Sequence, residues 1–173
     1  MVEIGVRFFW VLSTFLLTSV YVIAWARFQI VSIWPAFNPV DLHFATAIPI
    51  TLFHFFTALG VLFYFIGTGV WIKDRAFEIA PHDRPKAEKI YDIYKSANKL
   101  KGRVFPFITF TIFFGIMTFV LGGARSVEAI PLWLHPLTGT GLLLVSVASM
   151  PFVFSSIRKN MIFLDQASEI LES

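Results

Sequence analysis

Four long apolar stretches constrain this chain more than any other feature of its sequence. They cover approximately residues 8–26, 42–72, 104–122 and 132–157, and none has an Asp, Glu, Lys or Arg in its interior. A helix needs about 20 apolar residues to cross the roughly 30 Å hydrocarbon core of a bilayer. In lipid the backbone must satisfy its own hydrogen bonds, and a helix does so within one segment. The sequence therefore predicts an all-α integral membrane protein, an antiparallel bundle of four transmembrane helices.

The overall composition supports lipid as the solvent of this chain. Hydrophobic residues make up 57% of the 173 residues and charged residues only 14%, whereas soluble domains carry about 25% charged residues. We expect a single membrane domain over residues 1–173. The absence of cysteine excludes disulfides, iron–sulfur clusters, thiolate zinc sites and a c-type haem attached through this chain.

The basic residues predict the orientation of the bundle. Most of the 14 lysines and arginines fall within 73–103, before the first span (Arg7) or after the last (Arg158 and Lys159). Only Arg27 and Arg125 lie on the other side. The positive-inside rule therefore places the loop 73–103 and both termini in the cytoplasm of a multi-pass protein. Because topology accounts for this basic charge, we expect no nucleic-acid partner.

The cytoplasmic segment has a pattern of its own. From Pro85 onward its apolar residues recur every three or four positions, which predicts an amphipathic helix. This helix either lies on the cytoplasmic membrane surface or runs directly into the third span. The tail 161–171 shows a similar spacing, and we expect it to continue the fourth helix or to dock on a partner. Asn38-Pro39 is typical of the start of the second helix.

Several glycines lie inside the apolar stretches. Gly67-Thr68-Gly69 and Gly139-Thr140-Gly141 follow no strand, so they are not phosphate-binding loops. We interpret them, together with Gly115, Gly122 and Gly123, as small residues that let neighbouring helices approach. The five tryptophans lie mostly near predicted helix ends, as expected of an interfacial belt.

Three of the four histidines lie in or at the ends of predicted spans. His43 and His54 are separated by about 20° around their helix and about 16 Å along it, so they share one face. The second and fourth spans run in the same direction, which places His43 and His135 at similar depth near the outer boundary. If those helices are neighbours, the two imidazoles could approach one group from opposite sides. A b-type haem or another transition metal needs that arrangement.

Other residues extend or limit this hypothesis. Asp41 and Glu128 could complete a metal site with His43 and His135, or accept hydrogen bonds from its ligands. His54 lies deeper, where it could ligate a cofactor, hydrogen-bond a quinone, or pair with a Ser or Thr of another helix. Each histidine could instead have a purely structural role at its helix end. Three membrane histidines allow one bis-histidine haem within a chain.

Three functions remain open from the sequence. The first is a small membrane subunit of electron transfer that binds haem, another metal or quinone through His43, His54 and His135. The second is a cofactor-free accessory or scaffold subunit, and the third is a small transporter or channel. No hydrolase or zinc-protease motif appears, so a stand-alone enzyme is not expected. We expect the partners to be the lipid bilayer and other membrane subunits or further copies of this chain.

Overall fold

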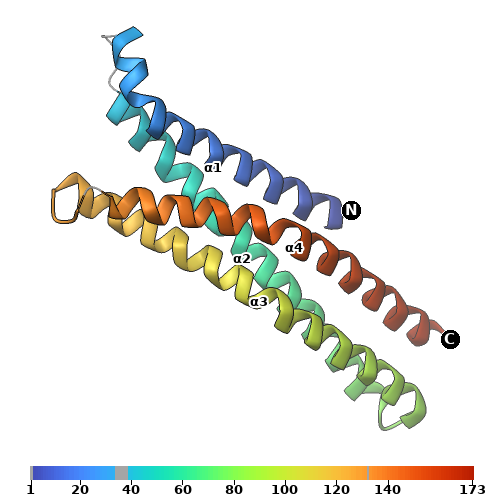
Figure 1. The fold of residues 1–173 in the computed structure, drawn as a ribbon. Coiled ribbons are helices and arrows are strands. Elements are labelled where there is room, and N and C mark those ends of the chain that lie inside the picture. Colours follow the sequence, from blue (N-terminus) through green and yellow to red (C-terminus); the bar gives the residue numbers. More distant parts are fainter. Residues whose placement is uncertain (1, 34–38, 132) are drawn as a thin grey trace.

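The computed structural model describes residues 2–33, 39–131 and 133–173, without the side chains of residues 2, 3, 26–33, 39–41 and 126. It contains four helices: α1 (Val2–Ile33), α2 (Pro39–Ile79), α3 (Arg84–Ser126) and α4 (Leu134–Glu172). They form an antiparallel all-α bundle, and both termini lie at the same end of it as the short α2–α3 turn (Figure 1). All four helices are long and apolar enough to cross a membrane. The predicted fold is confirmed.

Three of the helices are longer than a bilayer requires. Helices α2, α3 and α4 have 41, 43 and 39 residues, so each is about 60 Å long at roughly 1.5 Å per residue. Only residues 80–83 separate α2 from α3, because most of the segment 73–103 is helical. The predicted amphipathic helix is therefore the first half of α3 and runs directly into the third span. The tail likewise continues α4.

Local sequence explains where these helices begin and end. Asp83 caps α3, since its carboxylate accepts a hydrogen bond of 3.0 Å from the backbone N–H of Lys86, and Pro85 occupies the first turn. Helix α2 begins at Pro39 as predicted, while the predicted cap Asn38 lies outside the described residues. Helix α3 does not stop at Gly122-Gly123 but continues to Ser126.

The core is divided into two clusters along the bundle. One contains residues of all four helices, including Trp10, Phe65, Ile108 and Ile157. The other, built around Ile72 and Ile90, contains residues of α2, α3 and α4 only. These three helices therefore extend beyond α1 as a separately packed unit at the end of the bundle that carries the α2–α3 turn.

At the opposite end the bundle opens. There the α1–α2 pair and the α3–α4 pair diverge from one another (Figure 1). Within the α3–α4 pair the helices are close, because a Cβ added at Gly141 would lie 2.7 Å from Cε1 of Phe114. The interpretation of glycines as contact residues holds for Gly141 and Gly122. It is wrong for Gly67 and Gly69, where no atom of a neighbouring described helix would lie within 4 Å of an added Cβ.

Candidate functional site

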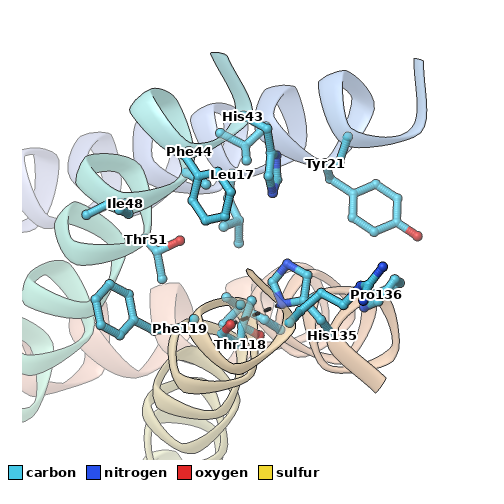
Figure 2. Close-up of a pocket in the computed structure, with 18 of the residues that line it drawn as sticks. Leu17, Tyr21, His43, Phe44, Ile48, Thr51, Thr118, Phe119, His135 and Pro136 are labelled. Carbon is cyan, nitrogen blue, oxygen red and sulfur yellow. Dashed lines mark hydrogen bonds between the residues drawn. The ribbon is translucent and has the colours of Figure 1, made fainter. Parts of the chain in front are cut away.

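A cavity of about 580 Å³ lies between the two diverging helix pairs. All four helices contribute to its wall, and most of the lining is apolar. Figure 2 shows Leu17 and Tyr21 of α1 and Phe44 of α2 on one side, with Phe119 of α3 and Pro136 of α4 on the other. Cavities of this size, lined by apolar side chains with a few convergent polar groups, are typical of small-molecule and cofactor sites.

The convergent polar groups in this cavity are two imidazoles. His43 lies in the second turn of α2 and His135 in the first turn of α4, and both helices start at the open end of the bundle. Their ring centres are 6.2 Å apart, with the ring planes inclined at 72°. The two rings face each other from opposite walls of the cavity (Figure 2). The condition set by the sequence, that the second and fourth helices bring these two residues together, is therefore met.

His135 is held in one tautomer by its surroundings. Its Nδ1 lies 3.1 Å from the backbone carbonyl oxygen of Thr118 on α3. A carbonyl can only accept, so Nδ1 donates, and the lone pair of the neutral ring is then on Nε2. Figure 2 shows this second nitrogen pointing across the cavity toward His43. Histidines that bind metals commonly donate their other ring N–H to a backbone carbonyl in this way.

Gly122 makes this position of the His135 ring possible. A Cβ added at Gly122 would lie 3.1 Å from Cε1 and 3.4 Å from Nδ1 of His135. Such contacts are tighter than ordinary van der Waals packing, so a larger residue would displace the imidazole. The ring therefore lies directly against the α3 backbone, within reach of the Thr118 carbonyl.

The separation of the rings matches two ligands on one ion. Metal–imidazole bonds are about 2 Å long, so two nitrogens on opposite sides of an ion are about 4 Å apart and their ring centres about 6 Å apart. The ring centres of His43 and His135 are 6.2 Å apart, which agrees with this expected separation. The donor set is thus two neutral nitrogen ligands, of the kind that iron, copper and zinc accept.

The two predicted carboxylate ligands are placed differently. Glu128 lines the cavity, on the α3–α4 loop, where its backbone has the left-handed φ of 59°. Asp41 belongs to the first turn of α2, but its side chain lies outside the described residues. Among the side chains that are described, no three of the His, Asp and Glu residues are close enough to hold an ion together. The described donors are therefore the two imidazoles.

His54 lies outside the cavity and has two polar partners. Its ring is 1% exposed. Nδ1 is 2.9 Å from Oγ of Ser13 on α1, and Nε2 is 2.8 Å from Oγ of Ser146 on α4. The predicted pairing with serine on another helix is therefore confirmed. The structure does not bring His54 to the other two membrane histidines, and His82 is exposed in the α2–α3 turn.

Sequence reasoning did not identify which serines pair with His54, nor that Trp10 lies against it. Trp10 is fully buried against it, with ring centres 5.8 Å apart, and the indole N–H donates to the Ser146 carbonyl at 3.4 Å. The N–H of Trp10 thus has its acceptor inside the bundle. The available signal was the occurrence of Ser13 and Ser146 within apolar spans, where hydroxyls need partners.

Comparisons with family models, curated proteins and solved structures found no match for this chain. The case for a function therefore depends on the cavity and the two imidazoles that face each other within it.

Proposed function

We propose that this protein is a small multi-pass membrane protein of electron transfer that holds one b-type haem in the cavity, with His43 and His135 as axial ligands. The observation that carries the proposal is the pair of facing imidazoles, 6.2 Å apart. Such a haem would carry one electron at a time, at a potential set by its axial ligands and surroundings.

Haem fits this site better than a single metal ion, because of the number of ligands that each needs and the size of the cavity. The macrocycle supplies four equatorial nitrogens, so the protein needs to contribute only two axial ligands. A lone ion would need more ligands than the two described imidazoles, and would not need a cavity of about 580 Å³. The apolar lining also favours a large flat apolar group. Attachment would be of the b type, since the chain has no cysteine.

Arg125 offers a partner for the carboxylates of a haem. It lies in the last turn of α3 and lines the cavity. A guanidinium binds a carboxylate through paired, charge-assisted hydrogen bonds. We propose that the propionate groups lie at this end of the cavity, near the outer boundary of the membrane, while the macrocycle lies deeper between the helices.

The orientation follows from the charge distribution. We propose that both termini and the α2–α3 turn are cytoplasmic, as the positive-inside rule requires. The haem would then lie near the outer leaflet, and the projecting part of α2, α3 and α4 would lie on the cytoplasmic side. Other membrane subunits, or further copies of this chain, would pass electrons to and from it.

Titration of detergent-purified protein with ferric haem tests the proposal. We expect one haem per chain and the absorption spectrum of a six-coordinate low-spin complex. His43→Ala and His135→Ala should each abolish that spectrum, because either leaves one axial position without its imidazole. The matched control is His82→Ala, which removes an exposed histidine and should bind haem normally.

Two outcomes would contradict the haem proposal. One is protein that folds but binds no haem at stoichiometric concentrations. The other is a low-spin spectrum that survives both substitutions, since the haem would then be held elsewhere. The first result would leave a cofactor-free accessory subunit as the better description of the chain. The second would mean that His43 and His135 are not the ligands of the haem.

A further inference from the structure

A cluster of hydrogen-bonded polar side chains is buried inside the bundle. It joins Ser13 of α1, His54 of α2 and Ser146 of α4, so that one imidazole bridges three helices. The haem proposal does not use this residue. A buried ionisable side chain within a membrane span is nonetheless a candidate for function.

The hydrogen bonds of the two serines decide what His54 can do. Oγ of Ser13 donates to the Trp10 carbonyl at 3.0 Å, and Oγ of Ser146 donates to the Leu142 carbonyl at 2.7 Å. A hydroxyl has a single proton. When both hydroxyl protons point to these carbonyls, the serines present only lone pairs to the ring, at 2.9 Å and 2.8 Å. With the serines in these positions, all hydrogen bonds are satisfied when both ring nitrogens carry protons.

A neutral ring requires a small rearrangement. It has one N–H, so one serine must turn its proton from the backbone carbonyl to the bare ring nitrogen. Ser13 has the longer carbonyl bond, 3.0 Å against 2.7 Å for Ser146, and is the one we expect to turn. The neutral ring then donates from Nε2 to Ser146 and accepts at Nδ1 from Ser13. The two protonation states differ by the rotation of one hydroxyl, without movement of a helix.

The groups around His54 allow a charge in the cavity to change the protonation state of its ring. The groups against the ring are Trp10 and Ser13 from α1 and Ser146 from α4, none of them charged. Burial disfavours a charged imidazole, so the neutral ring is the resting state. Thr51 precedes His54 in α2 by a rise of about 4.5 Å along the helix axis. Because Thr51 lines the cavity, the cavity extends along α2 to within about one turn of His54.

From this geometry we infer that His54, Ser13 and Ser146 form a proton-binding site that takes up a proton when the cofactor in the cavity accepts an electron. The inference rests on the proposed haem site. An external one-electron donor, such as a quinol, supplies the electron, and water supplies the proton that arrives at Nδ1. Each turnover thus adds one electron to the cofactor and one proton to His54. The added negative charge favours the cationic ring across a medium of low dielectric constant.

The experiment measures the midpoint potential of the haem-loaded protein between about pH 4 and pH 8, a range that extends below that of an exposed histidine because burial disfavours the charged ring. We expect the potential to fall as pH rises, approaching the roughly 59 mV per tenfold change in proton concentration of a one-electron, one-proton couple. In His54→Gln the dependence should disappear while the absorption spectrum stays the same. Glutamine can bridge both serines but cannot titrate. His82→Gln is the matched control and should keep the wild-type slope.

Several results would overturn the inference. A potential that does not change with pH, or an equal slope in His54→Gln and the wild type, would show that His54 takes up no proton. In both cases haem binding would stand, so the proposed function would survive. If no haem binds, both proposals fail together. Redox-difference infrared spectra of the wild type, with and without isotope-labelled histidine, require no variant, and an unchanged histidine charge on reduction would also overturn the inference.

Discussion

The ring of His135 occupies space that exists only because residue 122 of α3 is glycine. A methyl group at that position would lie 3.1 Å from Cε1 of the imidazole. The same approach brings Nδ1 within hydrogen-bonding distance of the Thr118 carbonyl. One small residue on α3 therefore controls the orientation of a proposed ligand on α4.

Enlarging Gly122 should weaken haem binding. Gly122→Val would push the His135 ring off the α3 backbone and break its bond to Thr118. Changes to such outer contacts of a metal ligand typically cost about 10–100-fold in affinity, and we expect a loss in this range in haem titrations. Gly67→Val is the matched control, since no atom of a neighbouring helix lies close to that position. Equal affinities for the two variants would show that Gly122 does not position the ligand.

Removing the charge of Arg125 should lower haem affinity without changing the axial ligands. Arg125→Gln deletes the cation that we assign to the propionates. We expect roughly 10- to 150-fold weaker binding, since a charge-assisted hydrogen bond contributes about 1.5–3 kcal/mol. The low-spin spectrum at saturation should be that of the wild type. Arg84→Gln removes an exposed arginine at the α2–α3 turn and should bind normally. A full-affinity Arg125→Gln protein would argue against this placement of the carboxylates.

Exchanging one axial ligand should raise the midpoint potential. In His135→Met a thioether replaces one imidazole, and His/Met ligation raises haem potentials relative to bis-histidine ligation. We expect haem to remain bound, with a higher potential in a redox titration. A potential equal to that of the wild type would indicate that His135 is not a ligand.

Truncating Ser146 should destabilise the bundle. In Ser146→Ala the buried Nε2 of His54 loses its partner, and an unsatisfied buried polar group costs about 1–3 kcal/mol. We expect a loss near the lower end of that range in detergent unfolding experiments, because polar contacts between membrane helices average less than those in water. Ser155→Ala removes an exposed serine that bonds only within its own helix. It should leave the stability unchanged, and similar losses in both variants would contradict the role of Ser146.

The sequence predicted the helices of this protein, but it did not predict most of the contacts between them. The four long apolar helices, the start of α2 at Pro39 and the place of Pro85 in the first turn of α3 followed from residue patterns. The similar depth of His43 and His135 also followed from them, but only the tertiary structure decided that the two rings meet. The pairing of Trp10 with Ser146, far apart in the chain, did not follow from residue patterns, because an indole N–H inside a span has several possible acceptors and local pattern does not choose among them. The same holds for the bond from His135 to Thr118. The first contact depends on how α4 is rotated against α1, and the second on how α4 is rotated against α3.

Sequence alone determined that this chain forms long apolar helices, because a backbone in lipid must satisfy its hydrogen bonds within each segment. Tertiary structure alone decided that the helix pairs diverge at one end and leave a cavity between His43 and His135. It also decided that His54 meets two serines rather than a cofactor. These outcomes depend on side-chain packing between helices, where a single glycine such as Gly122 lets a side chain of one helix lie against the backbone of the next.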